Sequence, residues 1–218
     1  MLATVAPCAL VIFTASFSFY GLTIEKGTEF DRLHSQGKLV LPEGDIYQAM
    51  YSRGVALLAE RGLQRYEVSN FARSGQESLH NQGYWNDAPY LAFGPGAHGY
   101  DGDRRWMNPH NLEDYLRWGE EGFPEAAREW DVLDAESRLA ESVSLGLRQA
   151  KGFELASLET IHNVHWSDVV FVKWENAQCL VREHGRVRLL ERGWPLLDEI
   201  CVDLLAQASQ ISLGMKSR

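Results

Sequence analysis

The sequence contains only three cysteines, Cys8, Cys179 and Cys201, among 218 residues. Their odd number and wide spacing argue against a disulfide framework. No CxxC or CxxxCxxC pattern is present to hold zinc or an iron–sulfur cluster. The simplest interpretation is that these are small buried thiols in a reducing cytoplasm.

A surplus of positive charge is also missing. Lys and Arg total 21 against 30 Asp and Glu, which gives a formal net charge of -9. Because nucleic-acid binding depends on cationic contacts to phosphate, this balance argues against a nucleic-acid partner. A basic set near the C-terminus is interleaved with acidic residues and is interpreted as a solvated face. That set consists of Arg182, His184, Arg186, Arg188 and Arg192.

The common catalytic signatures GxSxG, HExxH and GKS/GKT are absent. His162 and His165 lie three residues apart near Asp168, but no further donor is close in sequence, so we interpret them as surface residues. The first charged side chain is Glu25, which raises the alternative of an exported or membrane-inserted segment. No Lys or Arg precedes the apolar run, however, and Pro7 interrupts it. A buried strand behind a truncated or misread start is the preferred interpretation.

Periodicity predicts an α/β architecture in the first part of the chain. We expect strands at 16–25, 65–70 and 90–93, and helices at 27–37, 45–61 and 111–119. The strand–helix–strand order fits a parallel layer. After Pro124 the pattern changes to helices at 134–149, 156–162, 167–183 and 194–206, with a hairpin at 183–189. Helices with a small hairpin indicate a winged-helix-like module, so we place a boundary near residue 128.

A glycine-rich loop, Gly94-Pro95-Gly96-Ala97-His98-Gly99, has the spacing of a dinucleotide-binding GxGxxG motif. That motif requires a helix to open at its last glycine. Tyr100-Asp101-Gly102-Asp103 follows instead, which predicts a turn. We therefore reject the dinucleotide interpretation. What remains is either a loop whose backbone approaches a ligand closely or a plain tight turn.

The segment His80-Asn81-Gln82-Gly83-Tyr84-Trp85 places His80 and Tyr84 on one face if it is helical. An imidazole can ligate haem iron, and aromatic rings can sandwich a porphyrin. The alternative is a histidine that is hydrogen-bonded in packing.

Taken together, these segments resemble the HemW-type branch of the oxygen-independent coproporphyrinogen III oxidase-like radical SAM family. The matching segments follow the family's order and are YGLTIEKGT at 20–28, YEVSNFAR at 66–73, HNxxYW at 80–85, GPGAH at 94–98, Trp106 with Asn108, and GW with LDEI at 193–200. The resemblance implies the C-terminal part of a partial (β/α) radical SAM barrel at 16–127. A small helical, winged-helix-like module at 128–218 would follow, and 1–15 would be an atypical start of unclear origin.

The resemblance also implies ligands. Family members carry a [4Fe-4S] cluster, bind S-adenosylmethionine and associate haem with HNxxYW. Carried over, His80 is the expected haem contact, with Asn81, Tyr84 and Trp85 shaping the pocket. The expected S-adenosylmethionine contacts are Tyr20, Gly21, Ala97 and His98.

The missing CxxxCxxC is a departure from the family, because thiolates must hold the cluster that reductively cleaves S-adenosylmethionine. We therefore expect a haem-binding or haem-trafficking protein of the cytoplasm that is not catalytic alone. Alternatives are an oxygen-independent coproporphyrinogen III oxidase and a non-functional fragment. Expected partners are haem and an unknown acceptor, which could be membrane-associated. An unpaired edge strand at 17–24 predicts self-association.

Overall fold

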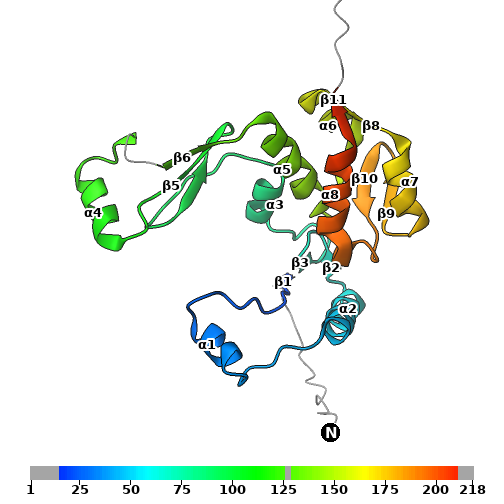
Figure 1. Cartoon of the computed structure of the whole chain (residues 1–218), viewed down its shortest axis with the longest axis horizontal. Coiled ribbons are helices and arrows are strands. Elements are labelled where there is room, and N and C mark those ends of the chain that lie inside the picture. Colours follow the sequence, from blue (N-terminus) through cyan, green and yellow to red (C-terminus); the bar gives the residue numbers. More distant parts are fainter. Residues whose placement is uncertain (1–14, 126–128, 211–218) are drawn as a thin grey trace, which may run out of the picture. The chain divides into compact units, whose positions relative to one another are not determined.

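A computed structural model of the chain describes residues 15–125 and 129–210 (Figure 1). The chain divides between Glu77 and Ser78 into two compact units. The boundary predicted near residue 128 falls inside the second unit, and the assignment of 1–15, 16–127 and 128–218 to separate regions stays a prediction. Cys8 and most of the segment 1–15 lie outside the described residues.

The first unit contains a small antiparallel sheet and two helices. Its elements are β1 (Ser16–Ser18), α1 (Glu29–Ser35), α2 (Gly44–Glu60), β2 (Gln64–Arg65) and β3 (Asn70–Ala72). The sheet order is β1-β3-β2, and Phe17 lies opposite Phe71 in the β1–β3 register. Buried Leu58, Leu63 and Phe71 form the core of this unit, with Phe17, Phe19 and Val55 packed against them. In the described part of the sheet β1 is an edge strand, so self-association through it stays a prediction.

Two strand predictions in this unit are wrong in extent. The predicted strand 16–25 keeps only β1, and the predicted strand 65–70 is divided between β2 and β3. The division arises because the carboxylate of Glu67, a fully buried residue, accepts the N–H of Ser69 at 3.0 Å and closes a turn. The predicted helices at 27–37 and 45–61 are confirmed as α1 and α2.

The second unit begins with α3 (Leu79–Trp85) and a sheet of order β4-β5-β6, formed by β4 (His98–Tyr100), β5 (Arg104–Met107) and β6 (Glu129–Val132). Helix α4 (Leu112–Glu120) connects β5 to β6. The later elements are α5 (Ala135–Leu147), β7 (Phe153–Glu154), α6 (Leu155–His162), β8 (Val164–Trp166), α7 (Asp168–Asn176), β9 (Leu180–Glu183), β10 (Arg186–Leu189), a 3-10 turn (Trp194–Leu196), α8 (Leu197–Gln207) and β11 (Ala208–Gln210). They form two further sheets, β7-β10-β9 and β11-β8 (Figure 1).

Local chemistry explains several of these boundaries. Asn111 and Asp134 accept backbone N–H groups of the first turns of α4 and α5 and so act as N-caps. The β9–β10 hairpin turns at His184 and Gly185, both with positive φ (52° and 77°), as a two-residue hairpin loop requires. A fully buried core joins the helices to this hairpin and consists of Val143, Leu147, Phe171, Val187, Ile200 and Leu204.

The structure corrects three expectations for the fold. Every strand pair within 15–125 and 129–210 is antiparallel, so the predicted parallel layer is wrong for these residues. The helix predicted at 167–183 ends at Asn176, because Gln178 adopts a positive φ of 58° and β9 begins at Leu180. The strand predicted at 90–93 supplies only a single bridge, between Tyr90 and Tyr100.

Other expectations are confirmed. The glycine loop at 94–99 runs into β4 rather than a helix, in agreement with the rejection of a dinucleotide site. Cys179 and Cys201 are free and buried. The alternative of a membrane-inserted segment before Glu25 falls largely on residues 1–14, which lie outside the described residues. Within the described ranges, no helix combines the length and apolar character needed to cross a bilayer.

Candidate functional site

The HNxxYW segment forms α3, a two-turn helix whose N-cap, Ser78, accepts the N–H of Asn81 at 3.2 Å. On one side of this helix the rings of His80 and Tyr84 meet edge to face with centroids 4.8 Å apart. Tyr84 meets Tyr90 in the same way at 4.7 Å, and Tyr90 lies 6.0 Å from Tyr100. These four rings form an aromatic row that begins at the exposed imidazole of His80.

The inner end of the aromatic row is buried and fixed. Tyr100 is 3% exposed, and its hydroxyl lies 2.9 Å from Asp87 Oδ2 and 3.0 Å from the Gly102 carbonyl. Burial, and then the hydrogen bond to Asp87, raise the pKa of Tyr100 to about 12. The Arg105 guanidinium lies 4.9 Å from the centroid of the Tyr100 ring and forms an ion pair with Glu141 at 2.5 Å. The row therefore has a neutral, rigid base and one free end at His80.

The other side of α3 faces the interior of the second unit. The Trp85 carbonyl accepts from Nε2 of buried Gln149 at 2.9 Å, and Asn86 Oδ1 accepts from Lys151 Nζ at 3.0 Å. The indole Nε1 of Trp85 is buried and has no acceptor among the described residues. The motif is therefore divided, since His80 and Tyr84 remain at the surface while Trp85 is held against the end of α5.

A cavity of about 600 Å³ lies beside Trp85, and we call it the α3–α5 cavity. This volume is in the range of small-molecule sites. Apolar side chains supply part of its wall, namely Trp85, Leu133, Leu145, Phe153, Leu158 and Ile161. The ionisable side chains that line it are Asp87, Tyr100, Arg138, Glu141, Lys151, His162 and Arg186.

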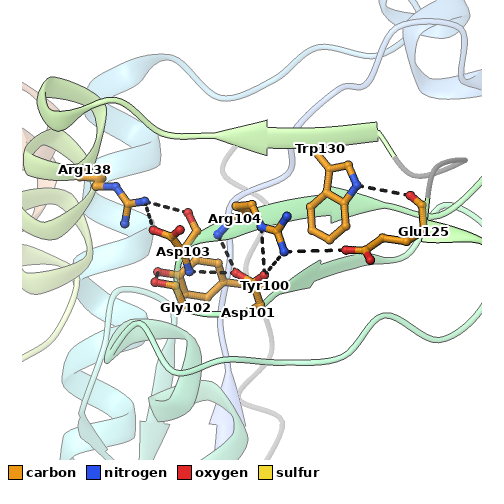
Figure 2. Close-up of polar contacts among 8 residues, drawn as sticks. All are labelled: Tyr100, Asp101, Gly102, Asp103, Arg104, Glu125, Trp130 and Arg138. Carbon is orange, nitrogen blue, oxygen red and sulfur yellow. Dashed lines mark hydrogen bonds and ion pairs between the residues drawn. The ribbon is translucent and has the colours of Figure 1, made fainter.

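The β4–β5 turn fixes one wall of this cavity (Figure 2). Asp101 Oδ1 accepts the N–H groups of Asp103 and Arg104 at 2.9 and 2.7 Å, and these bonds lower the pKa of Asp101. Arg138 on α5 donates to both the carbonyl and the carboxylate of Asp103, at 2.8 and 2.5 Å. Since Tyr100 and Arg138 both line the cavity, this turn positions its wall.

The residues predicted to contact S-adenosylmethionine fall in both units. Tyr20 is 64% exposed, and a Cβ on Gly21 would lie 2.1 Å from the Tyr47 hydroxyl, so a larger residue there would displace the Tyr47 side chain. In the second unit the Ala97 carbonyl accepts the Asn108 N–H at 2.9 Å, and His98 opens β4 with its side chain exposed. Ala97 and His98 are consecutive in the sequence, and the cofactor role of all four residues stays a prediction.

Sequence reasoning did not single out Gln149 or Lys151, and it assigned Arg186 to a solvated basic set. Lys151 and Arg186 line the cavity, whereas Arg182 pairs with Glu175 and Asp168. Within 15–125 and 129–210, no group of three His, Cys, Asp or Glu residues could hold a metal ion. This part of the chain therefore offers an exposed imidazole and a lined cavity rather than a metal centre.

Comparisons with known proteins relate the chain to one group. It is 37% identical over 145 residues to Heme chaperone HemW of Bacillus subtilis, a match that covers 66% of this chain and 38% of that protein. It is 34% identical over 192 residues to Heme chaperone HemW of Mycobacterium tuberculosis (86% and 47% covered). A mitochondrial relative from Danio rerio, radical S-adenosyl methionine domain-containing protein 1, is 31% identical over 215 residues (91% and 48% covered).

The solved structure of coproporphyrinogen III oxidase (HemN) from Escherichia coli, a radical SAM enzyme, matches with a TM-score of 0.58 at 17% identity. The match covers 78% of this chain and 44% of that one, and at this identity it shows a shared fold alone. No protein-family model matches the chain. The chain spans less than half the length of each of these relatives.

Proposed function

Since the chain is related to the HemW haem chaperones of the coproporphyrinogen oxidase-like radical SAM family, we propose that it binds haem at α3 and delivers it to an acceptor protein. The observation that carries this proposal is the exposed imidazole of His80, which meets Tyr84 edge to face. A neutral imidazole is an axial ligand of haem iron, and aromatic rings provide flat apolar contacts for a porphyrin.

The residues present fit haem in two respects. His80 keeps its side chain accessible while Tyr84 restricts the orientation of its ring, so ligation would not require α3 to rearrange. Trp85 and the α3–α5 cavity provide apolar surface at the other end of the same helix. Bound haem would supply an iron centre, and the protein's contribution is to orient the group and to limit its exposure to water.

The residues do not fit a [4Fe-4S] cluster. A cluster of this kind needs three closely spaced thiols, and the three cysteines of this chain are far apart in the sequence. Burial raises the pKa of the Cys201 thiol to about 11, so this cysteine stays protonated and is a poor ligand. We therefore propose binding and transfer rather than radical chemistry for this chain, and Tyr20, Gly21, Ala97 and His98 remain proposed S-adenosylmethionine contacts of the wider family. The acceptor is a protein in the same compartment, for which we propose the cytoplasm.

The test is a haemin titration of the full chain followed by absorbance. The wild type should give a shifted Soret band that saturates at one haemin per chain. His80→Ala should lose the part of that shift that comes from coordination of the iron by the imidazole. The matched control is His165→Ala, which removes an exposed histidine whose Nδ1 lies 2.8 Å from Glu159 and should leave the spectrum unchanged. A wild-type chain with no Soret shift would contradict the proposed function.

A further inference from the structure

The α3–α5 cavity has one cationic end, formed by Lys151 and Arg186. Arg186 Nε donates to the Lys151 carbonyl at 2.8 Å, and Arg186 Nη2 donates to the Gly152 carbonyl at 2.6 Å. Lys151 Nζ donates to the amide oxygen of Asn86 at 3.0 Å. All three acceptors are neutral, so these bonds hold both cations in place without offsetting their charge.

The other ionised groups of the cavity already have partners. Glu141 forms an ion pair with Arg105, and Asp87 lies 3.9 Å from the same guanidinium while it also contacts the Tyr100 hydroxyl. Arg138 is paired with Asp103. In the described part of the chain, Lys151 and Arg186 are thus the lining cations without a carboxylate within ion-pair distance.

Electrostatics at this end favours an incoming anion. Lys151 is exposed overall, and partial desolvation of its ammonium group, followed by the nearby Arg186 charge, lowers its pKa. A bound carboxylate would relieve that repulsion, and charge-assisted hydrogen bonds to carboxylates are stronger than neutral ones. The cavity therefore combines apolar surface with two cations whose hydrogen-bond acceptors are neutral.

We propose that Lys151 and Arg186 bind the propionate carboxylates of the tetrapyrrole. This inference rests on the proposed haem function and deepens it. His80 and Trp85 are five residues apart on α3, which is about 7.5 Å along a helix axis. One helix thus presents an imidazole for the iron at its start and reaches the carboxylate-binding cavity at its end.

The test separates the carboxylates from the metal. Wild-type chain, Lys151→Gln and Arg186→Gln are titrated with haemin, haemin dimethyl ester and metal-free protoporphyrin IX, with binding followed by quenching of tryptophan fluorescence. Each variant should weaken haemin and protoporphyrin IX roughly tenfold, the loss expected for one charge-assisted hydrogen bond. Neither should change binding of the ester, whose side chains carry no charge.

Arg188→Gln is the matched control, because it removes the same charge from the same strand. Arg188 pairs with Glu183 on the hairpin and does not line the cavity, so its variant should bind every ligand like the wild type. Lys151→Gln is the milder of the two test variants, since the Arg186 side chain also ties β10 to the Lys151 and Gly152 carbonyls.

The outcomes distinguish this inference from the proposed function. Equal affinity of the wild type for haemin and its dimethyl ester, or a Lys151→Gln variant that binds haemin normally, would overturn the propionate site while haem binding stands. Failure of all three ligands to bind would contradict the proposed function itself. Tenfold weakening confined to the free acids, in Lys151→Gln but not in Arg188→Gln, supports the site.

Discussion

The two units differ in how their apolar residues are arranged. In the first unit, Leu58, Leu63 and Phe71 form the core, α1 buries none of its residues, and large side chains such as Met50 remain 60% exposed. In the second unit, α5, α7 and α8 contribute fully buried residues that pack around the β9–β10 hairpin. Because burial of apolar surface is the main favourable term in folding, we expect most of the stability to come from the second unit.

The difference bears on function because the aromatic row and the α3–α5 cavity both belong to the second unit. Gln149 and Lys151 hold the end of α3, and Gln149 is itself 6% exposed. A site built on packed elements keeps its geometry before a ligand arrives. The first unit supplies Tyr20 and Gly21, which lie outside regular secondary structure. The haem proposal therefore depends on the better-packed unit.

The largest effect should come from Gly152→Ala in the second unit. A Cβ there would lie 1.9 Å from the Val187 carbonyl oxygen, and the backbone φ is 63°. The clash and the left-handed conformation together should cost about 3 kcal/mol or more in the free energy of unfolding, measured with urea. Gly185→Ala is the control, because its φ is also positive (77°) but no atom lies within 4 Å, so about 1–2 kcal/mol is expected. Equal losses in the two variants would contradict the packing at Gly152.

A loss of similar size is expected from Phe71→Ala, which removes the largest buried side chain of the first unit. Deletion of a buried Phe side chain costs about 3–5 kcal/mol, which is large for a unit with so small a core. Hydrogen exchange followed by mass spectrometry should show loss of protection at 64–72, with the amides of α5 and α8 unchanged. Phe171→Ala should do the reverse. If Phe71→Ala also deprotected α5, the two units would be coupled rather than independent.

The sequence predicted elements whose boundaries depend on single residues. The helices predicted at 111–119 and 134–149 and the hairpin predicted at 183–189 are confirmed, and the structure shows that the N-caps Asn111 and Asp134 and the turn at Gly185 fix their boundaries. The failures come from interactions that apolar periodicity does not encode. Gln178 adopts a conformation that usually requires glycine, and the buried Glu67 carboxylate closes a turn inside what looks like one strand.

The candidate site was predicted in part for a similar reason. HNxxYW is contiguous, so His80 and Tyr84 could be placed on one helix face from spacing alone, and their ring contact confirms that placement. The cavity is assembled from residues more than 60 positions apart, and one of its fixing contacts is to the Trp85 backbone carbonyl. A backbone carbonyl leaves no trace in residue identity, so Gln149 could not be recognised from the sequence.

A smaller effect is expected from removal of helix N-caps, and it should differ between the two units. Asp134→Ala removes the acceptor for the Ser137 N–H at the start of α5, which should cost about 1 kcal/mol and lower the melting temperature. Thr28→Ala removes the equivalent acceptor for Asp31 in α1. Since α1 has no buried residue, its loss should leave the main thermal transition unchanged. A lower melting temperature in Thr28→Ala would show that α1 contributes to the packed core after all.

The smallest effect should be a pH dependence at His162, which lines the α3–α5 cavity. Burial, and then the charge of Arg138, lower the pKa of His162 below its usual value. The unfolded chain therefore binds this proton more tightly than the folded chain, and stability should fall as pH drops below about 6.5, the ordinary histidine value. His162→Gln should flatten the difference between the melting temperatures at pH 7 and pH 5.5, whereas His165→Ala should not. Because His162 Nε2 lies 2.9 Å from Ser142 Oγ, glutamine preserves a polar partner for Ser142, and a slope that persisted in His162→Gln would assign the acid sensitivity to other groups.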